Sequence, residues 1–178
     1  PVERFDTFVL DGVLNHSWLH PDSGQQTTAM YLQDQYVADL HNAMGGYSPH
    51  GIYAQLYLNG LHWGMYYVHE RPDHTWAAEM FGGNKDAYDA IKHSSSGVIN
   101  SGIGGAGATA NYNTMSGAAS AVAGDPTNLT KWQTLQQQLD VDSFIDYILA
   151  NWYAGNNDWP AKTWYATHRV PGGQWRFH

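Results

Sequence analysis

The stretch from Asp140 to His168 constrains the fold most strongly, because it joins a long amphipathic pattern to a strand pattern through a short polar loop. Asp140 can cap the start of a helix, and Gly155 suits its end. The apolar residues between them recur every three or four positions, as on the buried face of a helix: Val141, Phe144, Ile145, Ile148, Leu149 and Trp152. We therefore predict a buried helix, the loop GNNDWP and an aromatic strand, TWYATH.

The loop GNNDWP carries one carboxylate, Asp158. A carboxylate held between a buried helix and a strand can orient or deprotonate an attacking hydroxyl, or help to hold a divalent cation. An aspartate that hydrogen-bonds to the local backbone of a turn would fit the same residues. The chemistry of the residues alone supports the catalytic and the turn interpretation of Asp158 equally.

The N-terminal part of the chain predicts a strand and a helix. The segment FDTFVLD, residues 5–11, alternates apolar and polar side chains as a strand does, and residues 13–27 have the composition of a loop. Thr27 and Thr28 can cap a helix over Ala29 to Ala43. The apolar stripe of this helix is Leu32, Tyr36, Leu40 and Met44.

A β-hairpin is predicted next, because the segments IYAQLYL and LHWGMYYV flank Asn59-Gly60, a pair that supplies the positive φ angles of a type I′ turn. Pro72 ends the second strand, and Asp73 can start a short helix to Phe81. Glu70 at the end of that strand fits either a groove residue or an ion-pair partner of Arg71 or of a surface Lys. Taken alone, Glu70 favours the ion-pair interpretation.

The second half of the chain predicts further strands and helices around a long loop. YDAIKH, residues 88–93, has a strand pattern, whereas residues 94–124 are almost wholly Gly, Ala, Ser, Thr and Asn and predict a long mobile loop or insertion. A helix is expected from Leu129 to Leu139, and TWYATHR and QWRFH predict a second hairpin about the Pro-Gly-Gly turn at 171–173. This order of elements favours an α+β fold with antiparallel sheets.

The composition limits the classes of partner. The formal net charge is -8 with 8 Lys plus Arg, so we expect no nucleic-acid partner. No apolar run reaches the roughly 20 residues of a membrane span, and no signal peptide begins the segment. The absence of cysteine excludes disulfides and thiolate metal sites.

Two further motifs are given little weight. The string Gly102–Gly107 matches G-x-G-x-x-G, but it lies in a low-complexity segment without a predicted strand before it or a predicted helix after it, so a flexible loop is the better interpretation. The 10 histidines lack H-E-x-x-H spacing, so a metal site built from histidines is not expected.

Taken together, the segments resemble the CotH family of spore-coat and secreted protein kinases. The resemblance follows the order of the family and covers most of the chain outside the Gly/Ala/Ser segment. The segments that carry it are NHSWLHP (15–21), YLQDQYVADLHNAMG (31–45), LYLNGLHWGMYYVHERPD (56–73), YDAIKH (88–93), LDVDSFIDYILANWYAGNNDWP (139–160) and PGGQWRF (171–177).

The resemblance implies an incomplete protein-kinase-like bilobal α+β fold, with an antiparallel sheet and hairpin plus a mainly helical C-lobe. Residues 1–69 would form the N-lobe-like part and residues 70–73 the hinge-like connector. Residues 74–178 would form the C-lobe-like part, with a flexible segment at 94–124. The helix from Ala29 to Ala43 would be similar to the N-lobe helix of kinases.

The family's activity implies transfer of the γ-phosphoryl group of ATP, with Mg or Mn, to Ser or Thr of secreted or coat proteins. By this resemblance, Asp158 falls at the catalytic-loop aspartate, which orients the attacking hydroxyl and accepts its proton. Glu70 falls beside the expected adenine position. The resemblance also implies a secreted, cell-surface or spore-coat location, and it leaves the metal-binding residues of this chain unknown.

The chain departs from the family pattern in three places. The family usually has a metal-binding Asn five residues after the catalytic Asp, where this chain reads Lys162 and Thr163. The nucleotide-contacting Lys of the family comes from a strand upstream of residues 5–11, and its metal-binding acidic motif follows the segment WRF. Neither lies within these residues. We therefore expect this segment alone to be inactive or nearly so.

Two alternatives follow from these departures and from the composition. A catalytically inactive kinase-like module of a surface or spore-coat protein would explain Lys162 and Thr163. An aromatic-lined carbohydrate-binding domain is suggested only by the content of 8 Trp and 12 Tyr.

Overall fold

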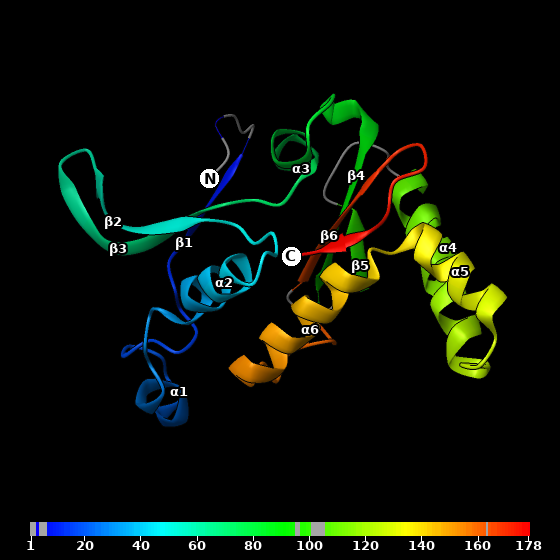
Figure 1. The fold of residues 1–178 in the computed structure, drawn as a ribbon. Coiled ribbons are helices and arrows are strands. Elements are labelled where there is room, and N and C mark those ends of the chain that lie inside the picture. Colours follow the sequence, from blue (N-terminus) through cyan, green and yellow to red (C-terminus); the bar gives the residue numbers. More distant parts are fainter. Residues whose placement is uncertain (1–2, 4–6, 95–96, 101–105, 163) are drawn as a thin grey trace.

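The computed structural model describes residues 3, 7–94, 97–100, 106–162 and 164–178. Figure 1 shows two parts that are joined by the connector after β3, each built on its own antiparallel sheet. The first part holds a three-stranded sheet with helices α1 and α2. The second part holds a four-stranded sheet with helices α3 to α6.

The first sheet has the order β1-β3-β2, formed by Phe8–Asp11, Leu61–Glu70 and Gly51–Leu58. The predicted hairpin is confirmed, with Asn59 at a φ of 50° and Gly60 at 81° between the two longer strands. The strand predicted over residues 5–11 is confirmed from Phe8 onward, and residues 5 and 6 lie outside the described part of the chain.

Two predictions for the first part were wrong in part. Residues 13–27 were expected to be a loop, yet α1 spans Ser23–Thr27. Asp22 caps this helix, because its side chain accepts a hydrogen bond from the Gln25 amide. The second helix, α2, spans Gln33–Ala43 rather than beginning at Ala29. Tyr31 has a φ of 59°, and this left-handed residue separates the two helices.

The predicted apolar stripe of α2 is also wrong in part, because Leu32, Tyr36 and Met44 are exposed. The residues that α2 buries are Ala38 and His41. This helix packs against α6, as Figure 1 shows, and the His41 ring meets the Tyr147 ring of α6 edge-on.

The second sheet has the order β5-β4-β6-β7, and every neighbouring pair is antiparallel. Its strands are β4 at Tyr88–Ser94, β5 at Gly97–Asn100, β6 at Trp164–Arg169 and β7 at Arg176–Phe177. The strand predicted at 88–93 and the second hairpin are thereby confirmed. Helix α3, His74–Phe81, follows the connector and begins after Asp73 as predicted, and a 3-10 turn at Lys85–Ala87 precedes β4.

Most of the segment 94–124, which was predicted to be a loop, is structured. It contains β5 and the 19-residue helix α4, Ala106–Gly124. Alanine is the best helix former, and the residues that α4 buries, Ala108, Met115 and Val122, recur every seven positions along one helix face. Most of the glycine string at 102–107, predicted to be a flexible loop, lies outside the described residues.

Helices α5, Leu129–Gln138, and α6, Val141–Ala154, confirm the predicted helices and caps: the Asp140 side chain accepts from the Ser143 amide, and Gly155 has a φ of 64°. The predicted stripe of α6 was wrong in part, since Ile145, Leu149 and Trp152 are exposed and the fully buried positions are Tyr147, Ala150 and Asn151. The main core lies between α4, α5 and α6 and one face of the second sheet. It includes Ile91, Leu135, Tyr147, Trp164, Ala166, Trp175 and Phe177.

Two buried histidines lie where the two parts meet. His178 Nδ1 donates to the carbonyl oxygen of Tyr47 at 2.6 Å, and the Thr167 hydroxyl donates to His178 Nε2 at 2.8 Å, so a neutral ring satisfies both contacts. Burial lowers the pKa of His178 to about 3. His41 on α2 contacts Ser48 Oγ at 2.7 Å and packs edge-on against Tyr147, and burial lowers its pKa as well.

Acid is expected to destabilise the fold through His178. The unfolded chain binds a proton on this ring below about pH 6.5, whereas the folded chain excludes it down to about pH 3. The free energy of unfolding should therefore fall by about 1.4 kcal/mol per pH unit as the pH drops through this window, and this ring should add no pH dependence above it. Urea unfolding at a series of pH values from neutral to about pH 5 measures the slope.

The matched variants isolate this contribution from that of the carboxylates. His178→Gln removes the titrating ring. It should reduce the slope of the free energy of unfolding against pH by about 1.4 kcal/mol per pH unit, the value for one proton. His62→Gln changes an exposed histidine of the β2–β3 hairpin and should keep the parental slope. Equal slopes in the parent chain and in His178→Gln would contradict the assignment of a buried neutral ring.

Candidate functional site

The loop that carries Asp158 is anchored to the buried end of α6. Gly155 ends the helix in the left-handed conformation, and the Asn156 amide then donates to the Asn151 carbonyl oxygen. Asn151 is buried, and its side-chain nitrogen donates to the Tyr147 carbonyl oxygen at 2.9 Å. The Asn156 side-chain nitrogen donates to Asn151 Oδ1 at 2.7 Å. These bonds fix Asn156 on the buried helix.

Asn156 in turn holds the backbone at Asp158. Its Oδ1 accepts hydrogen bonds from the amides of Asp158, at 3.1 Å, and Trp159, at 3.3 Å. Asn156 is therefore the turn residue of this loop, in the role that the turn interpretation gave to Asp158. The carboxylate of Asp158 is 53% exposed and is not needed to satisfy these two amides.

The structure adds Lys162 to the surroundings of Asp158. Its Nζ lies 3.2 Å from Asp158 Oδ1, and its amide donates to the Asp158 carbonyl oxygen at 3.0 Å. The sequence had shown Lys162 only as a departure from the family pattern. The spacing of four residues between opposite charges was the signal that could have revealed the pair. Thr163 lies outside the described residues.

Glu70 lies at the end of β3, where the chain leaves the first sheet. Its Oε2 accepts from the His50 amide at 2.9 Å and from the indole nitrogen of Trp76 at 3.0 Å, and it lies 3.3 Å from His50 Nδ1. Trp76 is fully buried in α3. Glu70 therefore ties the start of β2 to the helix after the connector through His50 and Trp76, which the sequence had not suggested as its partners.

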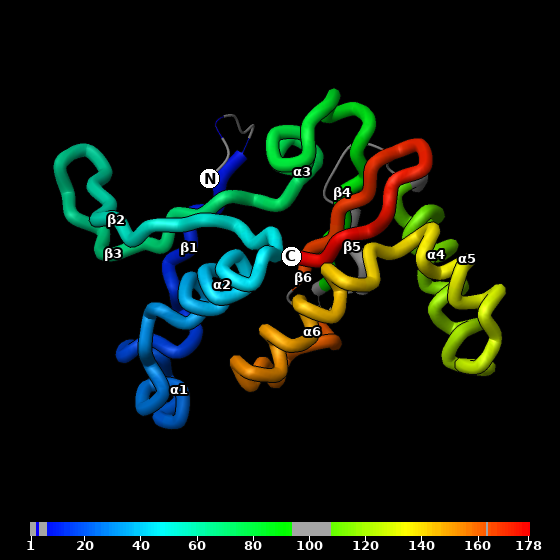
Figure 2. The backbone as a smooth tube through the Cα atoms, in the orientation of Figure 1, coloured from blue at the N-terminus to red at the C-terminus, as the bar shows by residue number. Residues whose placement is uncertain are grey.

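The connector, residues 70–73, is also held by buried side chains and hydrogen bonds. Pro72 is fully buried, and the buried Asp73 accepts from the amides of Thr75 and Trp76 through Oδ1 and from the Thr7 hydroxyl through Oδ2. These contacts fix the direction in which α3 leaves β3. The backbone trace in Figure 2 shows this connector and the loop after α6 at separate places in the molecule. Glu70 and Asp158 also contact different residues: Glu70 contacts His50 and Trp76, whereas Asp158 contacts Asn156 and Lys162.

A divalent metal needs several oxygen ligands at one place. Within the part of the chain that the structure describes, no group of three or more His, Asp or Glu side chains could hold a metal ion. The Asp158 carboxylate is paired with Lys162. The described residues therefore do not make up a metal site by themselves.

The chain thus combines two small antiparallel sheets with six α-helices in a mixed α+β architecture, counted over the described residues. A family model described as CotH kinase protein matches residues 22–178, and the chain therefore belongs to the CotH kinase family. The mixed α+β architecture is consistent with an incomplete kinase-like fold. No curated protein matches the chain. None of the described helices is long and apolar enough to cross a bilayer.

Proposed function

We propose that this chain is the central part of a protein kinase that transfers the γ-phosphoryl group of ATP to Ser or Thr of a protein substrate. The observation that carries the proposal is the placement of Asp158. Asn156 takes over the hydrogen bonds of the turn, which leaves the carboxylate exposed on a backbone that is fixed to a buried helix. An exposed carboxylate on a rigid support is suited to orient a hydroxyl.

In the proposed reaction, Asp158 accepts the proton of the substrate hydroxyl as its oxygen attacks the γ-phosphorus. The bond from the γ-phosphorus to the bridging oxygen breaks, and ADP leaves. Lys162 Nζ lies 3.2 Å from Asp158 Oδ1, so it brings positive charge to the place where the phosphoryl group would be transferred. Mg or Mn supplied with ATP would neutralise charge on the phosphates.

The rigid connector supports a place for the nucleotide between the two parts. Glu70 would border the adenine there, but Oε2 is already used by His50 and Trp76, so its role is to shape the connector rather than to bind the base through that oxygen. By family membership, we further propose that the protein acts at the cell surface, in a spore coat or after secretion.

A non-catalytic role of the same fold is the second candidate. The observation in its favour is Lys162, which stands next to the residue position where the family pattern has a metal-binding Asn and pairs with the Asp158 carboxylate. A protein of this kind would serve as a binding module of a coat or surface protein. It would keep its fold without nucleotide.

The decisive experiment uses the full-length protein with labelled ATP and Mg or Mn. We expect ATP with metal to raise the melting temperature, because a ligand that binds only the folded state stabilises it. Phosphate should also appear on Ser or Thr of a substrate protein or of the kinase itself. A thermal shift without phosphate transfer would favour the binding module, and the absence of both would contradict the kinase proposal.

A further inference from the structure

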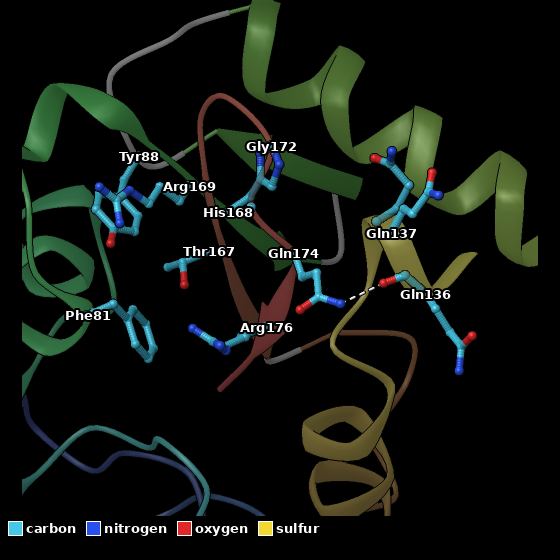
Figure 3. A pocket seen from close by; sticks show the side chains of 12 residues that line it. Phe81, Tyr88, Gln136, Gln137, Thr167, His168, Arg169, Gly172, Gln174 and Arg176 are labelled. Atoms are coloured by element: carbon cyan, nitrogen blue, oxygen red, sulfur yellow. Dashed lines mark hydrogen bonds between the residues drawn. The ribbon is translucent and has the colours of Figure 1, made fainter. Parts of the chain in front are cut away.

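A cavity of about 690 Å³ lies on the second sheet, and none of the residues that line it belongs to the loop of Asp158. Figure 3 shows Arg169 and Tyr88 on one side of it and Gln136 and Gln137 on the other, with Thr167 between. The cavity is thus bounded by the start of β4, by the β6–β7 hairpin and by the end of α5. Its volume lies within the range of cavities that bind organic ligands and is much larger than a single phosphate needs.

The charged side chains that line the cavity are basic. Two arginines and no Asp or Glu are among the described residues that line it, although the formal net charge of the chain is -8. Arg176 is fixed in place: its Nε donates to Asp140 Oδ2 at 2.9 Å, and its guanidinium lies 4.7 Å from the ring centre of Phe81. Arg169 is exposed at the end of β6. Because Asp140 offsets the charge of Arg176, Arg169 is the lining arginine that favours an anionic ligand.

The opposite wall identifies the class of anion. Gln137, Gln138 and Gln174 line this wall with side-chain amides, each of which has both a donor and an acceptor, and Gln136 turns its carbonyl oxygen toward Gln174. The end of this wall is held by the Gln174 side chain, which donates to the Gln136 carbonyl oxygen at 2.5 Å. A free phosphate is bound chiefly through donors and is too small to span this wall. An acidic peptide presents a carboxylate for Arg169 and backbone amides that can both donate and accept.

We propose that this cavity binds an acidic peptide segment, with a Glu or Asp side chain of the peptide on Arg169 and its backbone along the glutamines. The inference does not depend on phosphate transfer, because the cavity and the loop of Asp158 lie on different elements. Binding can be measured directly without ATP.

Isothermal titration calorimetry at low salt, with a short capped peptide of alternating glutamate and glycine as the probe, tests the proposal. Arg169→Gln should weaken binding about tenfold or more, because it removes a charge-assisted hydrogen bond. The exposed Gln137 on the other wall gives a second variant. Gln137→Glu should weaken binding severalfold by repulsion. Lys131→Gln, which removes a positive charge on α5 outside the cavity lining, should bind like the parent.

Two further probes separate the alternatives. A glutamine–glycine peptide should bind much more weakly than the acidic one, and inorganic phosphate should not displace the acidic peptide at comparable concentration. Equal binding of the two peptides, or unchanged binding by Arg169→Gln with a parental melting temperature, would overturn the proposal. Displacement by phosphate at peptide-like concentration would also overturn it, since the site would then take any oxyanion.

Discussion

The Asp158→Ala variant of the full-length protein is expected to transfer phosphate roughly 10²- to 10⁴-fold more slowly than the parent while it binds ATP about equally well. The variant loses the carboxylate that orients the substrate hydroxyl and accepts its proton. The fold should survive, because the side chain is 53% exposed and its paired Lys162 is on the surface. Initial rates with labelled ATP, together with the ATP-dependent thermal shift, provide the measurement.

Two matched variants make the result specific to Asp158. Asp142→Asn removes an exposed carboxylate from the first turn of α6 and should leave the rate unchanged. Asn156→Ala removes the acceptor of the Asp158 amide and should lower kcat more than it changes KM, because the carboxylate is then present but poorly positioned. An unchanged rate in Asp158→Ala would sink the assignment of this residue.

Sequence patterns predicted those parts of the fold that depend on chemistry within a few residues. The Asn59-Gly60 turn, the Asp73 cap and the Asp140 and Gly155 ends of α6 are all confirmed. Each depends on a side chain that satisfies a backbone group within three or four positions, or on a residue that tolerates a positive φ. Because these interactions join residues that are close in the sequence, they can be recognised before the fold is known.

The predictions that failed depend on contacts between distant residues. The apolar pattern of α6 has more hydrophobic positions than one face can bury, and only the packing partners select Tyr147 over Leu149. Helix α4 was missed because a segment rich in Gly, Ser and Asn lacks a strong apolar stripe. It is a helix that packs on β4 and β5 and buries Ala108, Met115 and Val122, one residue every two turns.

The candidate site likewise has features that the local sequence predicts and features that depend on distant residues. The loop and its carboxylate could be predicted from the Gly155 stop and the residues that follow. The role of Asn156 could not, because it depends on Asn151, which is buried only in the folded helix. The partners of Glu70 were equally hidden, since His50 lies 20 positions away and meets it only through the pairing of β2 with β3.

Replacing Tyr147 by alanine is expected to destabilise the chain by about 3–5 kcal/mol, as truncation of a large buried aromatic does. Tyr147 is 5% exposed, and its ring packs against four others, those of His41, Phe144, Trp159 and Phe177. The alanine variant leaves a cavity between α6, α2 and β7, so both parts of the molecule lose packing. Urea unfolding, with the midpoint and slope both fitted, gives the free energy of unfolding.

Leu149→Ala on the same helix is the control that distinguishes the two faces of α6. Leu149 is 47% exposed, so its truncation should cost less than about 1 kcal/mol. The hydrophobic pattern alone predicts the reverse order, because it places Leu149 on the buried stripe and leaves Tyr147 off it. Equal or greater loss in Leu149→Ala would mean that the helix is rotated about its axis. A rotated helix would also move Asn151 off the buried face, because Asn151 lies one turn after Tyr147. The anchor of the Asp158 loop on Asn151 would then be lost.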